Sequence, residues 1–254
     1  MGKVLSAMLG ASDLSEFGEK EVDDFNQAKR LPAIILVDTS GSMKRYEDLL
    51  KQAVASLYDE ILRDGTARSA TELAVMTFNS DIEILERMKE IELQESKGRN
   101  LDFHCEGVTL TGLATKAAIK HLEARIATYK QSAPIVPYYP PILFVLSDGY
   151  PFCGANCPDE VRRQEEMAMR ESKQYIRAEV AANRLVVVSV EVGDGCDHEL
   201  MRELTGLDDD RHVFKVNDST ELANFFRFTS SILISSSKNG TKSLNDMSLV
   251  EMFQ

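Results

Sequence analysis

Short apolar runs alternate along this chain with longer segments in which apolar and polar residues recur at a helical spacing. The apolar runs are expected to form buried strands over residues 33–37, 142–146, 185–192 and 212–216. Two further strands are expected over 71–78 and 82–88. Only Asn79-Ser80-Asp81 separates this pair, and a connection so short predicts that the two strands are antiparallel.

Between the strands, apolar residues recur at spacings of three and four, the period of an amphipathic helix. This pattern predicts helices over residues 44–62, 111–129, 159–183, 197–204 and 220–234. Strands that alternate with helices in this way are typical of α/β proteins. We therefore expect a doubly wound, Rossmann-like α/β fold: a mostly parallel six-stranded sheet with one antiparallel strand and helices on both faces.

The pattern predicts a single domain over residues 31–235, because it shows neither an internal repeat nor a second hydrophobic core. Residues 1–30 are polar and acidic and are expected to form an N-terminal extension, helical in part. Residues 236–254 are rich in Ser, Lys, Asn and Gly, so we expect a mobile C-terminal tail. The end of the tail, 249–253, is apolar enough to dock on the domain.

Composition narrows the function classes. The chain has 254 residues and a net charge of −12, a balance that repels phosphate backbones and argues against a nucleic-acid partner. No segment reaches the roughly 18 apolar residues that a membrane helix needs. The N-terminus lacks the features of a signal peptide, so we expect a cytoplasmic protein whose four cysteines are mostly reduced.

Oxygen-bearing side chains follow two of the apolar strands. Asp38, Ser40 and Ser42 come directly after the strand 33–37, and Asp148 follows the strand 142–146. In a doubly wound sheet of order 3-2-1-4-5-6 these strands are neighbours at the point where the order reverses, which is where such folds bind ligands. Two carboxylates and neighbouring hydroxyls suit Mg²⁺, with Mn²⁺ or Ca²⁺ as alternatives, and they do not suit zinc.

Three motifs resemble those of the von Willebrand factor A (VWA) domain family. They are Asp-Thr-Ser-Gly-Ser at 38–42, Gly-Val-Thr-Leu-Thr-Gly at 107–112 and Leu-Ser-Asp-Gly at 146–149. In that family they form the metal-ion-dependent adhesion site (MIDAS). The resemblance implies that Thr109 joins Asp38, Ser40, Ser42 and Asp148 as a metal ligand, and that an acidic residue of a partner protein completes the coordination.

Within the family, the chain looks most similar to the bacterial tellurium-resistance-associated TerY type. The similarity rests on Asp-Thr-Ser-Gly-Ser-Met, Val-Met-Thr-Phe-Asn-Ser, Val-Phe-Lys-Val and Phe-Phe-Arg-Phe, while the segment 151–158 departs from the short turn expected there. This resemblance implies a non-catalytic, metal-dependent protein-interaction module that acts in tellurite or stress resistance.

Simpler or different interpretations remain for several residues. Asp38, Ser40 and Ser42 alone could be helix caps. The same carboxylates could serve a Mg²⁺-dependent phosphatase or hydrolase, although the sequence shows no positioned base or phosphate clamp. Cys153 and Cys157 could form a second metal or redox site, but we favour two partly exposed loop thiols. We expect Glu165-Glu166 to be solvated surface.

Overall fold

The computed structural model describes residues 29–94, 98, 101–149, 151, 153–155, 157–241 and 244–253. Most of the expected N-terminal extension, residues 1–28, therefore lies outside the described residues.

A mixed sheet forms the centre of the fold. Its strands are β1 (Leu31–Asp38), β2 (Thr71–Phe78), β3 (Ile82–Glu90), β4 (Ile142–Ser147), β5 (Val186–Val192) and β6 (Val213–Val216). Their order is β3-β2-β1-β4-β5-β6, with β3 antiparallel to β2 and every other neighbouring pair parallel. This arrangement confirms the predicted doubly wound six-stranded sheet and its single antiparallel strand.

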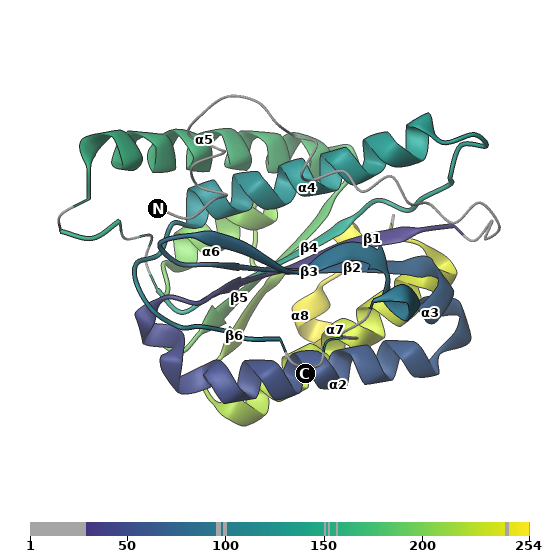
Figure 1. Ribbon diagram of the computed structural model, residues 1–254, viewed down its shortest axis with the longest axis horizontal. Coiled ribbons are helices and arrows are strands. Elements are labelled where there is room, and N and C mark those ends of the chain that lie inside the picture. Colours follow the sequence, from purple (N-terminus) through teal and green to yellow (C-terminus); the bar gives the residue numbers. More distant parts are fainter. Residues whose placement is uncertain are drawn as a thin grey trace.

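Helices cover both faces of the sheet (Figure 1). On one face lie α4 (Thr111–Gln131), α5 (Asp159–Ala181) and α6 (His198–Thr205); on the other lie α2 (Glu47–Arg63), α3 (Gly65–Ala70), α7 (Ser219–Asn239) and α8 (Leu249–Phe253). Strand β1 supplies both cores, because its side chains alternate between the two faces. Ile34 and Leu36 pack in the core under α4 and α5, whereas Ile35 and Val37 pack in the core under α2 and α7.

Two elements differ from the sequence prediction. No helix was predicted between residues 62 and 71, but the Asp64 carboxylate accepts hydrogen bonds from the N–H groups of Thr66 and Ala67 (3.1 and 3.0 Å) and starts the short helix α3. A 3-10 helix, Gly41–Tyr46, also precedes α2, so that the α-helix proper begins at Glu47.

The C-terminal segment also differs from the mobile tail expected over 236–254. Helix α7 continues to Asn239, so the predicted boundary at 235 falls inside a helix. Leu249, by contrast, is fully buried in the core under α2 and α7, which agrees with the docking expected for the apolar end of the tail. The Ser-rich composition suggested a solvated tail, but Ser236 and Ser237 are small enough to be buried on the inner side of α7.

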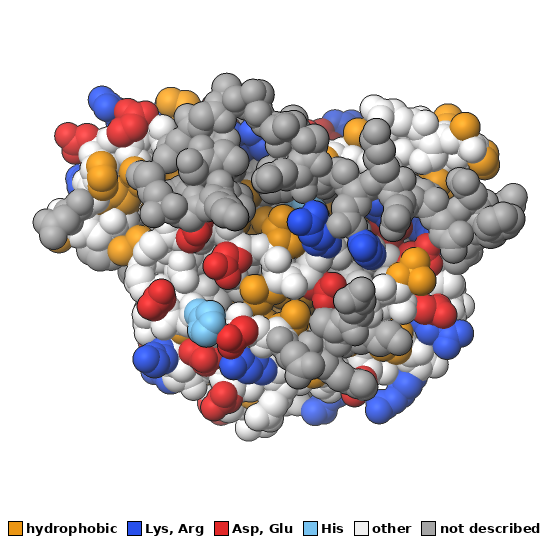
Figure 2. Space-filling model, in the orientation of Figure 1, with side chains coloured by type: hydrophobic (Ala, Val, Ile, Leu, Met, Phe, Trp, Pro, Cys, Tyr) orange, Lys and Arg blue, Asp and Glu red, His pale blue; other side chains and the backbone are white. Residues whose placement is uncertain are grey.

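Among the described residues, no helix combines the length and apolarity needed to cross a membrane. Acidic and basic side chains are interspersed over the described part of the face in Figure 2 rather than separated into one basic surface. The cytoplasmic location and the lack of a nucleic-acid partner stay predictions from the sequence.

Candidate metal centre

The central strands β1 and β4 bring the two predicted carboxylates to one edge of the sheet. The strands are parallel, with Val37 opposite Leu146. Asp38 is the last residue of β1, and Asp148 follows the last residue of β4. Since β1 and β4 are neighbours at the reversal of strand order, both aspartates lie at the crevice where doubly wound sheets bind ligands.

Hydrogen bonds connect four of the five predicted site residues into one continuous group. The Ser40 N–H donates to Asp38 Oδ1 (2.8 Å), which folds the loop back over the end of β1. The Ser40 and Ser42 hydroxyls lie 3.2 Å apart. The Ser42 hydroxyl in turn donates to Asp148 Oδ1 (2.7 Å). Side-chain oxygens from two loops distant in sequence are therefore in direct contact.

Thr109 reaches the same edge on a third loop. The Glu106 N–H donates to the Thr39 carbonyl (2.8 Å), and the Gly41 N–H donates to the Gly107 carbonyl (3.4 Å). These backbone bonds hold the loop that carries Thr109 against the loop that carries Ser40 and Ser42. Thr109 itself is buried. Thr109 is therefore connected to the other four residues through the backbone hydrogen bonds between these loops.

Burial makes both carboxylates unfavourable as free anions. It raises the pKa of Asp38 to about 6, although hydrogen bonds from Ser147 and Ser40 oppose the rise. Burial also raises the pKa of Asp148, against a hydrogen bond from Ser42 and the positive charge of Arg45. A cation between the two would stabilise their ionised forms. The site therefore has the electrostatic character of a cation site.

The donor set fits a hard divalent cation. It consists of two carboxylates and three hydroxyls, and all-oxygen sets of this kind are preferred by Mg²⁺, Mn²⁺ and Ca²⁺. Within the described ranges, no three His, Cys, Asp or Glu side chains come together as a metal site. Such a cluster is not needed here, because serine and threonine supply the remaining oxygens.

Ser147 also belongs to this centre, although it is not among the five residues predicted from the sequence. Its hydroxyl donates to Asp38 Oδ2 (2.6 Å) across the β1–β4 pair, so both oxygens of Asp38 are hydrogen-bonded. The available signal was its position immediately before Asp148 in the Ser-Asp-Gly motif. Only the strand pairing shows that the hydroxyl reaches the other aspartate.

Two expectations for residues near the centre are wrong. Cys153 and Cys157 form a disulfide, with Cα atoms 5.5 Å apart, and are not a pair of free loop thiols; Cys105 and Cys196 are free. Their spacing of four lets the loop close on itself, which composition alone does not reveal. Glu165 is not solvated surface either, because it is 7% exposed and its carboxylate accepts hydrogen bonds from the start of α4.

Solved structures with similar folds include proximal thread matrix protein 1 from the mussel byssus, at 14% identity and a TM-score of 0.56 over 81% of this chain and 48% of that one. A form of that protein with a zinc-occupied MIDAS motif matches at 16% identity and a TM-score of 0.54, over 81% of this chain and 48% of the other. A von Willebrand factor type A protein from Catenulispora acidiphila matches at 18% identity and a TM-score of 0.52, over 81% and 43% of the two chains.

This chain thus spans less than half the length of each of these structures, and at such identities the likeness concerns the fold alone. The comparison with curated proteins gives no match. The sequence profile of the von Willebrand factor type A domain matches residues 34–228, from the first central strand into α7. Since that match covers well over half of the sequence and the sheet has the expected order, the chain belongs to the von Willebrand factor type A domain family.

Proposed function

We propose that this chain is a non-catalytic interaction module that binds a divalent cation through Asp38, Ser40, Ser42, Thr109 and Asp148. A remaining coordination position then accepts an acidic residue of a partner protein. The observation that supports the proposal most directly is the continuous group from Asp38 through Ser40 and Ser42 to Asp148, built from loops 106 residues apart.

The surroundings of the group favour an acidic partner. Asp38 and Asp148 are buried, whereas Ser42 is exposed, so a partner approaches from the side of Ser42. Two carboxylates and one dication are nearly neutral together, and a further carboxylate is therefore attracted to the cation. The Arg45 guanidinium lies close enough to Asp148 to oppose the rise in its pKa that burial causes, and it adds positive charge on this side.

We favour Mg²⁺ as the resident cation because every donor is a hard oxygen. Mn²⁺ and Ca²⁺ are alternatives. The donor type disfavours zinc, but the mussel byssus protein has been solved with a zinc-occupied MIDAS motif, so zinc belongs in the same titration series.

Isothermal titration calorimetry tests the metal site. Wild type, Asp38→Ala and Asp194→Ala are titrated with each of the four cations. Asp194 is a matched control, since it follows β5 at the same edge of the sheet but is exposed and paired with Lys215 (2.9 Å). We expect binding by wild type and Asp194→Ala and its loss in Asp38→Ala. Equal heats for wild type and Asp38→Ala would refute the site.

For the partner, the experiment is affinity capture with and without EDTA on wild type and Asp38→Ala. A protein retained only by metal-loaded wild type, and released when its own acidic residues are replaced, supports the proposal. Retention that is indifferent to both EDTA and Asp38→Ala contradicts it.

From the TerY-type resemblance, we further propose a role in tellurite or stress resistance. The test compares growth on tellurite of a strain lacking the gene after complementation with wild type or Asp38→Ala. Equal growth with wild type and Asp38→Ala would show that tellurite resistance does not depend on the metal centre.

The non-catalytic character is part of the same proposal. The alternative is a Mg²⁺-dependent phosphatase or hydrolase that uses the same carboxylates to activate water. A screen of phosphate esters with Mg²⁺ and Mn²⁺ distinguishes the two. Turnover that disappears in Asp148→Ala would establish the enzyme and overturn the non-catalytic assignment.

A further inference from the structure

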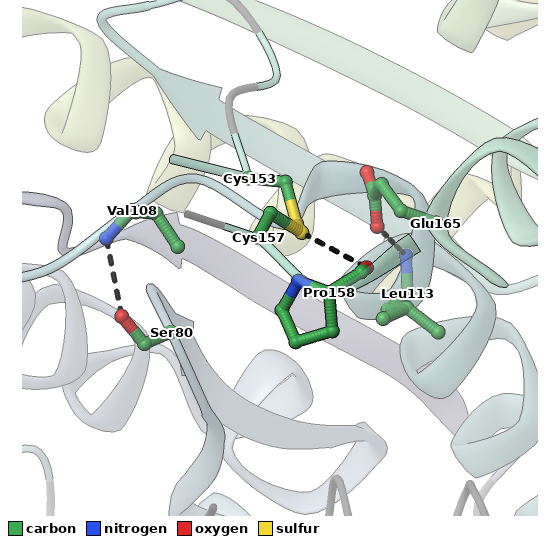
Figure 3. The surroundings of a disulfide bond; sticks show 7 residues. All are labelled: Ser80, Val108, Leu113, Cys153, Cys157, Pro158 and Glu165. Atoms are coloured by element: carbon green, nitrogen blue, oxygen red, sulfur yellow. Dashed lines mark hydrogen bonds between the residues drawn. A yellow bond between two sulfur atoms is a disulfide. The ribbon is translucent and has the colours of Figure 1, made fainter. Parts of the chain in front are cut away.

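The start of helix α4 is capped by a residue from another helix. The N-cap residue, Leu110, makes no side-chain cap hydrogen bond. The N–H groups of Gly112 and Leu113, which have no partner within α4, instead donate to Oε1 and Oε2 of Glu165 at 2.5 and 2.8 Å. Figure 3 shows the Glu165 carboxylate pointing at the Leu113 nitrogen. A single carboxylate on α5 thus satisfies two N–H groups in the first turn of α4.

Close packing of the two helices supports this contact. A Cβ atom at Gly112 would lie 2.6 Å from the Glu165 carbonyl oxygen and 2.8 Å from the Met169 nitrogen. Only glycine leaves room for the backbones to approach this closely. The position of α4 relative to α5 is therefore fixed at the turn that receives the Glu165 carboxylate.

The loop that precedes α4 is attached on its other side to the β2–β3 turn. The Val108 N–H donates to the Ser80 hydroxyl (3.2 Å), as Figure 3 shows. Thr109 directly follows Val108 and lies three residues before Gly112. The backbone is thus attached on both sides of Thr109. Ser80 binds the residue that precedes it, and Glu165 binds the helix turn that follows it.

We propose that Glu165 is a positioning residue of the metal centre: by fixing the first turn of α4 to α5, its carboxylate sets the position of Thr109 relative to Asp38 and Asp148. This inference rests on the metal binding proposed above. Helix α5 is the first α-helix after Asp148 in the chain. Glu165 therefore connects the segment that follows Asp148 to the loop that carries Thr109.

Carboxylate chemistry suits this role better than an amide. Each Glu165 oxygen accepts one N–H bond, and the negative charge lies at the N-terminus of a helix, where the helix dipole stabilises it. In Glu165→Gln one of the two oxygens becomes an NH₂ group that faces a backbone N–H, so one bond is lost at nearly constant volume. The first turn of α4, and Thr109 with it, should then become less well fixed.

The test measures Mg²⁺ affinity by calorimetry for wild type, Glu165→Gln and Glu166→Gln. Glu166 is the matched control, because it makes the same change of charge at the next position of α5 but is exposed. We expect Glu165→Gln to weaken Mg²⁺ binding by about 10-fold or more, the range found for residues that orient metal ligands. Glu166→Gln should bind like wild type. Wild-type affinity in Glu165→Gln would overturn the inference.

A second measurement separates positioning from a general structural effect. Glu165→Gln is made both in the wild-type chain and in a chain that already carries Thr109→Ala. If Glu165 acts through Thr109, the loss of affinity caused by Glu165→Gln should largely disappear when Thr109→Ala is already present. An equal loss in both backgrounds would overturn the inference, since Glu165 would then act on the whole fold. Should Glu165→Gln fail to fold, Glu165→Asp keeps the charge but is shorter, and it must show the same dependence on Thr109.

The results also distinguish this inference from the proposed function. Loss of Mg²⁺ binding in Asp38→Ala but not in Glu165→Gln leaves the metal centre intact and overturns only the role of Glu165. Absence of binding by wild type overturns both.

Discussion

Ser147 and Asp38, which are 109 residues apart, are joined by a hydrogen bond of 2.6 Å from the Ser147 hydroxyl to Asp38 Oδ2. Ser147 ends β4 and directly precedes Asp148, so one serine contacts the first carboxylate and positions the backbone of the second. The bond also favours the ionised form of Asp38 and so opposes the effect of burial, which on balance raises the pKa of this carboxyl to about 6. The pairing of β1 with β4 is therefore part of the construction of the metal centre.

Replacing Ser147 by alanine should weaken metal binding. Without the hydroxyl, Asp38 loses a hydrogen bond that orients and ionises it, and we expect a decrease in Mg²⁺ affinity of about 10-fold. Calorimetry at pH 7.5 measures the effect. Ser189→Ala is the matched control, because it removes a buried hydroxyl from the adjacent strand β5, outside the motif. If both variants bind Mg²⁺ like wild type, the Ser147–Asp38 bond does not contribute to the site.

A buried ion network at the opposite edge of the sheet should determine stability rather than metal binding. Glu72 near the start of β2 lies 2.6 Å from Arg125 Nε and 3.7 Å from Arg30 Nε, and the Tyr129 hydroxyl also donates to it. Both Glu72 and Arg30 are fully buried. Removing one partner of such a network leaves an uncompensated charge in the interior.

Accordingly, Glu72→Gln should lower the free energy of unfolding in urea by about 3 kcal/mol. Its Mg²⁺ affinity should stay unchanged, because the network lies at the N-terminal ends of the strands. Glu203→Gln removes a partner from the more exposed pair with Lys173 and should cost less than about 1 kcal/mol. Equal destabilisation by the two variants would show that burial of the network does not increase its contribution to the free energy of unfolding.

Much of the fold could be predicted because its signals are local. The apolar runs before Asp38 and Asp148 and the short turn at residues 79–81 define strands and their direction without reference to the rest of the chain. Asp38, Ser40 and Ser42 share one loop, and Asp148 could be placed beside them from strand order alone. Thr109 entered only through the family resemblance.

The contacts that the sequence did not reveal are long-range. Glu165 reaches α4 across 52 and 53 residues, and its neighbour Glu166 made it look like part of a surface charge run. Ser147 reaches Asp38 across 109 residues. Helix α3 was overlooked for a different reason, because Asp64 serves both as the end of α2 and as the N-cap of the next helix.

The Cys153–Cys157 disulfide predicts a specific labelling pattern. Denatured, non-reduced protein should take up alkylating reagent at Cys105 and Cys196 only, whereas reduction should expose all four thiols. Intact-mass spectrometry reads the difference directly. A disulfide that closes so short a loop should stabilise the protein by about 2 kcal/mol at most. The free energy of unfolding of Cys153→Ser, compared with wild type, tests this value. Labelling of four thiols without reductant would contradict the bridge and agree with the reduced state first expected from composition.

His212 should make the protein less stable in mild acid. Its side chain is buried, with ring nitrogens 3.0 Å from the Val187 carbonyl oxygen and 2.9 Å from the Leu244 carbonyl oxygen. Burial lowers its pKa, with Arg211 acting in the same direction and the carbonyl contacts opposing. Below pH of about 6.5, the ordinary histidine pKa, the unfolded chain therefore binds a proton more readily than the folded one, and stability falls as pH falls.

Urea unfolding at pH 7.5 and pH 5.5, in EDTA, tests this for wild type, His212→Gln and His104→Gln. The loss of stability between the two pH values should be smaller in His212→Gln, which has no imidazole to protonate. His104→Gln removes an imidazole that is exposed and lies 2.7 Å from Asp102, so it controls for the loss of a histidine outside the core. His198 contributes with the opposite sign, because a hydrogen bond to Glu191 raises its pKa, but it is present in all three proteins and cancels in the comparison. An identical pH dependence in wild type and His212→Gln would show that burial does not hold the His212 imidazole in its neutral form.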